Sequence, residues 1–325
     1  MTEKQNTYKI ASYNIENMGK WFTKDNKFKE QENEQREAVV KIIMDLQPHI
    51  LGIIEASRNS ADHEFFLENT SLKRMKFNIA KSENDRGKQD LAFYYREPFD
   101  IVSIDDNISF YDDWNEDIDA DGITEELNFE RKPLEVIFRN KETGDKFLII
   151  LVSFKSKGVF SAVDLYKYEH LALANRKKLY AQSKKVRQRI ENLMNEAPEL
   201  PFMVMGDIND EIGLDHFQKI IGTSAVETIM GDIFHPDKIL HNALWHLIEK
   251  KGKNKVWTVQ YPDPIISGIS HKSLIDHIFI SPQMLSPTGR ISYVKESGNI
   301  LNYQSNPGTK IASDHLPVYC KVKFQ

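Results

Sequence analysis

Seven polar residues lie directly beside apolar segments of this sequence, and their side chains could together bind a metal ion and activate water. They are Asn14, Glu55, Asp207, Asn209, Asp276, Asp314 and His315. A carboxylate at the end of a buried strand is costly unless it is solvated, paired or bound to a cation. Several carboxylates that converge with a histidine describe a site for a hard divalent ion such as Mg²⁺. Such an ion stabilises phosphoryl oxygens and helps to generate a hydroxide nucleophile.

Each of these residues has an ordinary structural explanation when it is taken alone. Asp207 and Asn209 follow an apolar segment in a way that is typical of a turn, because Asp and Asn side chains cap their own backbone. Asp314 and His315 are typical of a solvated loop. Glu55 follows five apolar residues and would need a salt-bridge partner inside the protein. The order and completeness of the set favour a catalytic site over these separate explanations.

Alternating strands and a few helices must position these side chains. The sequence predicts strands at residues 8–15, 50–54, 91–95, 99–104, 134–139, 147–154, 201–205, 274–280 and 316–324. Apolar residues recur at helical spacing in 31–46, and 162–195 is a second, longer helical segment. Because some strands are neighbours in sequence, the pattern favours stacked sheets with helices outside over a doubly wound parallel sheet.

Composition narrows the class of protein. The chain has 325 residues, of which 40% are hydrophobic, and it contains one cysteine, so we expect a large core and no internal disulfide. No apolar stretch is long enough for export or for a membrane span, which predicts a cytoplasmic protein. The net charge of −5 argues against a protein that wraps nucleic acid by charge alone, and it leaves room for an enzyme with a local basic rim.

Five ordered segments resemble the endonuclease/exonuclease/phosphatase superfamily, whose members share the fold of DNase I-like enzymes. They are SYNIEN (12–17), ILGIIEA (50–56), GDIND (206–210), LIDHIFIS (274–281) and SDHLPV (313–318). The resemblance runs over nearly the whole chain. It implies a four-layer α-β-β-α sandwich of two packed mixed β-sheets, formed by one domain over residues 1–325 with a core of about 8–323.

The resemblance implies a Mg²⁺ or Mn²⁺ site. Glu55 matches the metal-binding glutamate of the family, and Asn14 matches the asparagine that supports the metal from the first strand. Asp314 resembles a second carboxylate of the metal site.

The resemblance also implies roles for four catalytic residues. Asp207 matches the aspartate that orients or deprotonates the attacking water, and Asn209 the side chain that steadies that water and the phosphate. His315 resembles the catalytic imidazole, and Asp276 the carboxylate that orients it. An aspartate on one ring nitrogen fixes the tautomer and favours imidazolium beside an anionic transition state.

Ser153 departs from the pattern of many relatives, which carry a histidine at this position after the strand, while some abasic-site endonucleases carry a tyrosine. A serine hydroxyl donates to phosphate but does not act as a strong general acid near neutral pH. Three explanations remain open at this point. The enzyme uses another acid or a metal-bound water, the residue was changed to slow turnover, or the protein is a weakened relative that binds without turning over.

A phosphodiester site needs some cationic surroundings, and the sequence offers several candidates. Lys155 and Ser156 follow the strand that ends at Ser153, Arg86 precedes the strand at 91–95, and Arg131 precedes the strand at 134–139. We predict that these four residues contact substrate. Exposed loop charges without a ligand are the alternative.

Residues 117–122 read Asp-Ile-Asp-Ala-Asp-Gly, which matches the first half of a calcium-binding loop of the EF-hand type. The twelfth position is Asn128 instead of the bidentate glutamate that such loops use. A structural Ca²⁺ held by Asp117, Asp119 and Asp121 is therefore one interpretation, and a solvated acidic loop is the other.

The sequence as a whole predicts a divalent-metal-dependent phosphodiester hydrolase, and a nuclease acting on DNA or RNA in particular. The alternatives are a phosphomonoesterase or small-molecule phosphodiesterase of the same fold, or the non-catalytic relative that Ser153 raises. The expected partner is nucleic acid or another phosphodiester substrate, with no membrane and no protein partner.

Overall fold

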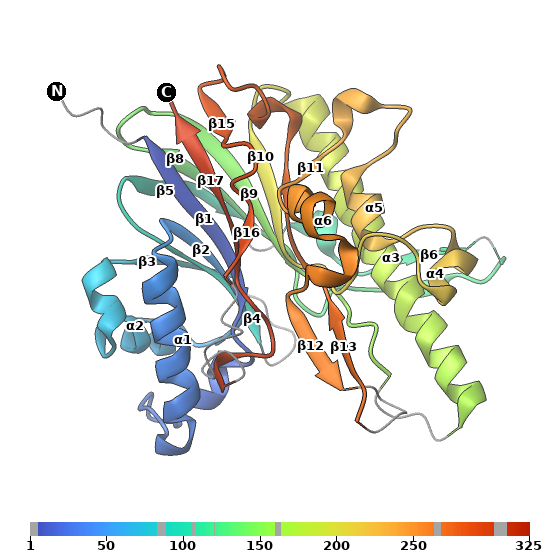
Figure 1. Ribbon diagram of the computed structural model, residues 1–325, viewed down its shortest axis with the longest axis horizontal. Coiled ribbons are helices and arrows are strands. Elements are labelled where there is room, and N and C mark those ends of the chain that lie inside the picture. Colours follow the sequence, from blue (N-terminus) through green and yellow to red (C-terminus); the bar gives the residue numbers. More distant parts are fainter. Residues whose placement is uncertain are drawn as a thin grey trace.

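The computed structural model describes residues 6–82, 89–105, 108–119, 121–159, 164–262, 268–301 and 311–325. Two β-sheets stack face to face, and helices cover the outer face of each (Figure 1). The predicted four-layer α-β-β-α sandwich is thereby confirmed.

The first sheet has seven strands in the order β15-β17-β1-β2-β4-β3, with β16 also paired to β17. Its strands are β1 (Thr7–Asn14), β2 (Ile50–Ala56), β3 (Asn78–Lys81), β4 (Asp90–Tyr95), β15 (Ile291–Tyr293), β16 (Asn299–Ile300) and β17 (Val318–Phe324). Strands β1 and β2 are parallel, and the remaining pairs are antiparallel, so the sheet is mixed.

The second sheet has six strands in the order β11-β14-β10-β9-β8-β5. They are β5 (Phe99–Asp105), β8 (Leu134–Asn140), β9 (Lys146–Ser153), β10 (Phe202–Asp207), β11 (His241–Asn242) and β14 (Asp276–Ile280). Here β9 and β10 are parallel and the other neighbours antiparallel. The strands predicted at residues 134–139 and 147–154 correspond to β8 and β9, which form an antiparallel hairpin in this sheet.

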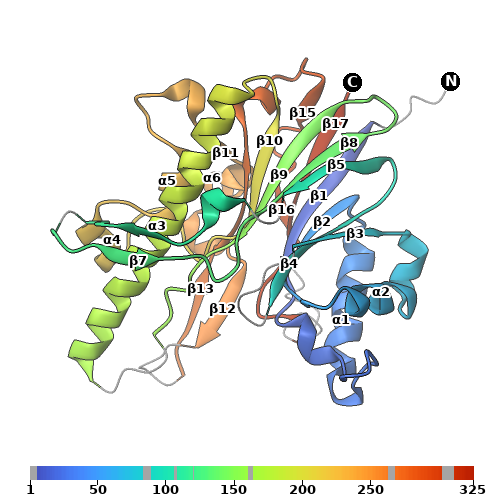
Figure 2. The ribbon, with the colours of Figure 1, turned by 180° about the vertical axis from the view of Figure 1, so that it is seen from behind.

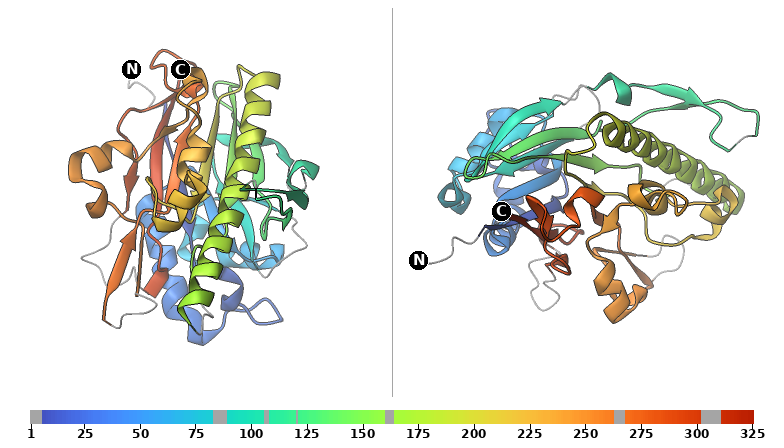
Figure 3. Two further views of the ribbon diagram at one scale, coloured as in Figure 1. Left: turned by 90° about the vertical axis from the view of Figure 1, so that its right-hand side faces the viewer. Right: turned by 90° about the horizontal axis from the view of Figure 1, so that it is seen from above.

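Two groups of helices form the outer layers. Helices α1 (Asn33–Leu46) and α2 (Ser60–Glu68) pack on the first sheet, and α3 (Leu165–Glu196) and α5 (Ala225–Met230) pack on the second. Figure 3 shows the long helix α3 running along the second sheet. The apolar residues of α1 face the sheet, as their spacing in the sequence predicts, and α1 ends one residue before Gln47, which adopts a left-handed conformation ahead of Pro48.

The core between the sheets follows from strand alternation, since successive side chains of a strand point to opposite faces. In β10, Met203 and Met205 lie in this core, while Val204 faces the outer helices. Gly52 of β2 allows the sheets to approach closely, because a Cβ there would lie 2.6 Å from a methyl carbon of Leu151. Side chains that continue the inward-facing positions beyond the apolar part of each strand must therefore meet at one end of the sandwich.

Several short elements complete the fold. They are α4 (His216–Ile221), α6 (Trp245–Lys251), β6 (Trp114–Glu116), β7 (Glu125–Leu127), β12 (Val259–Pro262), β13 (Ser270–Ser273) and the 3₁₀ helices Met18–Trp21, Glu30–Glu32, Ser71–Met75, Ser109–Tyr111, Pro236–Lys238, Lys253–Lys255 and Pro282–Met284. Strands β6 and β7 form a hairpin beside α3 (Figure 2), and β12 and β13 form another that projects past the ends of the main sheets. In the part of the chain that the structure describes, no helix is long and apolar enough to cross a membrane.

Candidate active site

Four strands bring polar side chains to one end of the space between the sheets. Asn14 ends β1, Ser153 ends β9, Asp207 ends β10, and Asp276 begins the antiparallel strand β14. Asp207 lies opposite Asp276 on one side and opposite Ser153 on the other. These four residues continue the inward-facing positions of their strands, so the fold alone places their side chains together.

Glu55 reaches the same region through an irregularity in β2. Strict alternation would place Glu55 on the helix-covered face together with Leu51 and Ile53. Instead, Glu55 has a positive φ of 61°, and the pairing of β2 with β4 shifts register between Ile54 and Ala56. This bulge turns the carboxylate toward Asn14. A strained backbone that re-aims one side chain is a common feature of functional sites.

The amide of Asn14 connects the two sheets. Its Nδ2 lies 3.4 Å from Oε1 of Glu55 and 3.3 Å from Oδ2 of Asp207, so it donates to a carboxylate in each sheet. Its Oδ1 accepts from the backbone N–H of Glu16 at 3.1 Å. Asn14 is 2% exposed, and its orientation is fixed by these three bonds.

Gln89 holds the other oxygen of Glu55, and sequence reasoning did not single it out. Its Nε2 donates to Oε2 of Glu55 at 2.5 Å, and its Oε1 accepts from Nη1 of Arg131 at 2.7 Å. Arg131, predicted to contact substrate, therefore lies at the site, one amide away from Glu55. The only signal in the sequence is the position of Gln89 just before the strand that pairs with the Glu55 strand.

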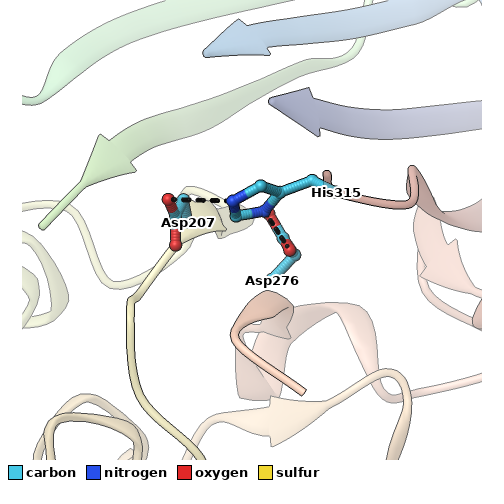
Figure 4. Close-up of side chains that lie close together, drawn as sticks. All are labelled: Asp207, Asp276 and His315. Atoms are coloured by element: carbon cyan, nitrogen blue, oxygen red, sulfur yellow. Dashed lines mark hydrogen bonds and ion pairs between the residues drawn. The ribbon is translucent and has the colours of Figure 1, made fainter. Parts of the chain in front are cut away.

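His315 lies between two aspartates (Figure 4). Its Nδ1 is 2.8 Å from Oδ2 of Asp276, and its Nε2 is 4.0 Å from Oδ2 of Asp207. The Oγ of Ser313 fixes the approach to the histidine, because it donates to the backbone oxygen of Asn14 at 2.7 Å and accepts from the N–H of His315 at 3.1 Å. Two segments that are 299 positions apart in the sequence thus meet in this site.

The buried carboxylates change the proton affinities of the site. Burial disfavours the imidazolium form of His315, but the charges of Asp276 and Asp207 outweigh it and raise the pKa of His315 to about 10. Burial raises the pKa of Asp207 above its ordinary value, and the nearby positive charge of His315 opposes this. At neutral pH the site therefore contains a charged imidazolium next to a carboxylate with increased basicity.

The turn after β10 is built to present Asp207 and Asn209. Gly206 has a φ of 145°, and a Cβ there would lie 2.0 Å from the backbone oxygen of Val152, so only glycine fits. Asn209 adopts a φ of 54°. Its backbone N–H donates to Oδ1 of Asp207 at 3.0 Å, and its Nδ2 donates to the backbone oxygen of Phe154 at 2.9 Å.

The segment after β9 lies along this turn. Ser153 is 4% exposed, and its Oγ has no hydrogen-bond partner among the described residues. Lys155 forms an ion pair of 3.2 Å with Glu130, and the Oγ of Ser156 accepts from the N–H of Gly158 at 3.1 Å. The structure therefore places Ser153 at the site, while the ammonium of Lys155 is directed to a neighbouring carboxylate.

Asp314 occupies the outer edge of the site. Its side chain is 56% exposed, and its Oδ1 lies 4.0 Å from Nε2 of His315. Glu16, on the loop after β1, faces the same region. Burial and the nearby charge of Asp314 raise the pKa of Glu16, which indicates that carboxylates crowd this edge.

The donor atoms of the site suit a hard divalent cation. The ligand atoms of Asp207, Asp276 and His315 lie within 4.8 Å of one another. Both ring nitrogens of His315 face aspartates, however, so this group is better explained as a hydrogen-bonded network. Glu55 supplies carboxylate oxygens of the kind that Mg²⁺ prefers, and Nδ2 of Asn14 holds that carboxylate in place. The crowding of carboxylates at this edge is the arrangement that a cation relieves.

The acidic loop of the predicted calcium site already contains a positively charged side chain among its carboxylates. Ligand atoms of Asp117, Asp119 and Glu125 lie within 4.8 Å of one another. The ammonium of Lys177 lies among this group, 2.7 Å from Asp119, 3.2 Å from Glu125 and 3.5 Å from Asp121. Asp117 accepts from the N–H groups of residues 121 and 122. A calcium ion at this loop stays a prediction.

Arg86, predicted to contact substrate, lies outside the described residues.

Comparison with solved structures supports the architecture. The chain is similar to the human Nocturnin catalytic domain with bound sulfate (17% identity, TM-score 0.53), covering 99% of this chain and 96% of that one. It is also similar to an endonuclease/exonuclease/phosphatase from Bacteroides vulgatus (17% identity, TM-score 0.54, 98% and 99% covered). A third similar structure is D. rerio TDP2 complexed with single strand DNA product (12% identity, TM-score 0.56, 98% and 99% covered). At these identities the likeness concerns the fold.

The amino-acid sequence was also compared with curated proteins and with protein families. A search of curated proteins finds no match. The sequence profile of the endonuclease/exonuclease/phosphatase family matches residues 11–315, a span that contains Asn14, Glu55, Asp207, Asp276 and His315. The chain therefore belongs to the endonuclease/exonuclease/phosphatase family.

Proposed function

We propose that this protein is a divalent-metal-dependent phosphodiester hydrolase, and specifically a nuclease that acts on DNA or RNA. The observation that carries the proposal is the buried network at the end of the sandwich, in which Asp276, His315 and Asp207 are linked in series and Asn14 connects Asp207 to Glu55. Because this network joins residues near both ends of the chain, we also propose that residues 1–325 form one domain.

Glu55, Asn14 and Asp314 would hold Mg²⁺ or Mn²⁺. The bound ion would supply positive charge to the phosphoryl oxygens and lower the pKa of coordinated water. Asn14 and Gln89 donate to the two oxygens of Glu55. Bonds of this kind orient a ligand and tune its affinity for the metal.

Asp207 and Asn209 would position and deprotonate the attacking water. A general base works best when its pKa lies near the operating pH. Burial brings Asp207 closer to that condition, because it raises the pKa of the carboxyl. The backbone N–H of Asn209 holds Oδ1 of Asp207 at 3.0 Å, which leaves Oδ2 toward the site.

His315 would stabilise the negative charge that develops on the phosphorane. It is held in the charged form by Asp276 at 2.8 Å, and it needs no reorganisation when the charge appears. Arg131 provides a second fixed positive charge near Glu55 through Gln89. The attack at phosphorus would be in line, with the leaving oxygen departing on the far side from Asp207.

Nucleic acid is the proposed substrate class. A similar structure, D. rerio TDP2, was determined with a single strand DNA product. The net charge of −5 implies that contact with a long polyanion is local and metal-assisted. A small-molecule phosphodiester or a phosphomonoester is the second candidate, and Ser153 is the observation that favours a relative with weak turnover, because its hydroxyl is no strong acid.

A substrate panel with metal control tests the proposal. The purified protein is assayed on plasmid DNA, single-stranded DNA, RNA, bis-p-nitrophenyl phosphate and p-nitrophenyl phosphate, with EDTA and then with added Mg²⁺ or Mn²⁺. We expect cleavage of nucleic acid that EDTA abolishes and Mg²⁺ restores. Cleavage of only the small esters would favour the second candidate, and binding of nucleic acid without cleavage of any substrate would favour a non-catalytic relative.

A further inference from the structure

The β12–β13 hairpin is attached directly to the segment that carries His315. Val259 of β12 forms an antiparallel bridge with His315, and the N–H of Leu316 donates to the backbone oxygen of Thr258 at 2.7 Å. The Oγ1 of Thr258 accepts from the N–H of Asp276 at 3.2 Å. The base of the hairpin and the His315–Asp276 pair are therefore parts of one hydrogen-bonded unit.

The geometry of this unit determines which hairpin residues share a face with the imidazole. Residues directly opposite each other in an antiparallel pair have side chains on the same face, and so do residues two apart along a strand. Val259 pairs with both His315 and Ser273, and Tyr261 pairs with His271. Tyr261 and His271 therefore extend the face on which His315 presents its imidazole to the site.

Tyr261 and His271 form an aromatic pair that is open to solvent. Their ring centroids are 5.7 Å apart, with an angle of 36° between the planes, and Tyr261 is 43% exposed. The hydroxyl of Tyr261 lies 3.4 Å from the Oγ of Ser273, which helps to hold the ring over the hairpin. Packing in the core does not explain the position of the Tyr261 ring, because the ring is exposed. An aromatic ring that is held in place and exposed is suited to contact a ligand.

The opposite face of the hairpin is arranged differently. Lys272 belongs to that face by alternation, and its ammonium lies 4.6 Å from the ring centroid of Trp257. This ammonium contacts one face of the Trp257 ring, which is half-buried, whereas the more exposed ring of Tyr261 lies beside His271.

The distance between His315 and Tyr261 determines which part of a substrate could contact the Tyr261 ring. Tyr261 is two residues beyond Val259, which corresponds to about 7 Å along the strand. A phosphate placed at His315 would bring the base of the adjoining nucleotide to the ring, and the phosphate of a diester without a base would leave the ring unused. Stacking of bases on aromatic side chains tolerates any sequence, because every base has a π-face.

We propose that the Tyr261–His271 pair is a stacking platform for the nucleobase that adjoins the scissile phosphate. This platform makes the enzyme select nucleotide diesters over diesters without a base. The inference rests on the proposed function, and it adds a preference for single-stranded substrate, because a base that stacks on protein must leave its own helix.

Two diesters with the same leaving group test the platform. Thymidine 5′-(p-nitrophenyl phosphate) carries a base, and methyl p-nitrophenyl phosphate does not. We expect Tyr261→Ala to raise KM for the thymidine diester about tenfold with little change in kcat, and to leave the methyl diester unaffected. Tyr261→Phe should keep wild-type values, because it keeps the ring. An equal loss on both diesters, or no loss on either, would overturn the proposal.

A binding measurement separates this proposal from the proposed function. A single-stranded oligonucleotide with one 2-aminopurine is titrated with protein in EDTA, where cleavage is not required. We expect quenching of its fluorescence by the wild type and by Tyr261→Phe, and a roughly tenfold weaker effect with Tyr261→Ala. The matched control is Tyr166→Ala, an exposed tyrosine on α3. Quenching that Tyr261→Ala does not reduce would refute the platform even in a protein that cleaves nucleic acid, and quenching lost with Tyr261 would support it even if no substrate is cleaved.

Discussion

Ser153 lies directly opposite Asp207 on the neighbouring parallel strand, with its side chain facing the same space between the sheets. Its hydroxyl is buried, and within the described residues it has no hydrogen-bond partner. A buried polar atom without a partner is unfavourable unless a ligand completes it. We therefore interpret the Ser153 hydroxyl as a hydrogen-bond donor to the substrate phosphate. As a weak acid, this hydroxyl does not supply the proton that a leaving group requires.

Ser153→His should introduce the missing acid. We expect turnover of bis-p-nitrophenyl phosphate to increase by at least about tenfold, because a positioned acid contributes roughly 10²-fold or more. The increase should be larger for a diester with a poor leaving group, since such a group depends on protonation. Ser153→Ala is the control, and it should lower turnover only slightly. Equal or lower turnover of the histidine variant on several substrates would show that this position does not lack an acid.

The charge state of His315 should depend on Asp276. The pKa of His315 is raised to about 10. The charged imidazolium therefore makes its full contribution to the free energy of unfolding at a pH below the ordinary pKa of about 6.5, and this contribution is lost as the pH rises toward 10. Asp276→Asn should bring this pKa down toward its ordinary value. An NMR titration of the imidazole proton, assigned with His315→Gln, measures both proteins. A histidine that titrates near pH 6.5 in the wild type would contradict the charged network.

Gln89 should affect the affinity for metal. Because it donates to Oε2 of Glu55 and accepts from Arg131, we expect Gln89→Ala to weaken Mn²⁺ binding by about tenfold, the lower range for residues that orient a ligand. Isothermal titration calorimetry measures this without substrate. Gln31→Ala, an exposed glutamine ahead of α1, is the matched control. Unchanged Mn²⁺ affinity in Gln89→Ala would remove Gln89 from the metal site.

Calcium binding at the acidic loop should depend on Lys177. Its ammonium already lies among Asp119, Asp121 and Glu125, so an ion there must displace it. We expect millimolar Ca²⁺ to raise the melting temperature of Lys177→Met more than that of the wild type, because the variant lacks the competing charge. Differential scanning fluorimetry with Mg²⁺ as the control ion measures the shift. No shift in either protein would rule out a calcium site at this loop.

The fold was largely predictable from the sequence, because the strands that form the core are apolar and end at polar residues. The prediction of two packed mixed sheets depended on the family resemblance, and the order of the strands within each sheet was not predicted. The β12–β13 hairpin was not predicted, since Gln260, His271 and Lys272 form no apolar pattern and its stability comes from the bonds of Thr258 and Val259 to the His315 segment.

Site residues were predictable from the sequence where the residue type itself indicates acid–base or metal chemistry. They were less predictable where the backbone geometry determines which side chains reach the site. Asp207, Asp276 and His315 were identified from their types and positions, and the structure brings them together. The bulge that turns Glu55 inward has no signal in an unbroken apolar segment. Gln89 was missed because a neutral amide gives no chemical signal by itself, and the ion pair of Lys155 with Glu130 could not be known without the fold.

The central claim is that the network of Asp207 and His315 hydrolyses phosphodiesters with a divalent metal. The most direct test is the initial rate of cleavage of a labelled single-stranded oligonucleotide in Mg²⁺ by the wild type and by Asp207→Asn, purified identically so that a contaminating nuclease would appear in both. We predict EDTA-sensitive cleavage by the wild type and a rate at least about 10³-fold lower for a folded Asp207→Asn protein. Equal rates for the two proteins would contradict the claim.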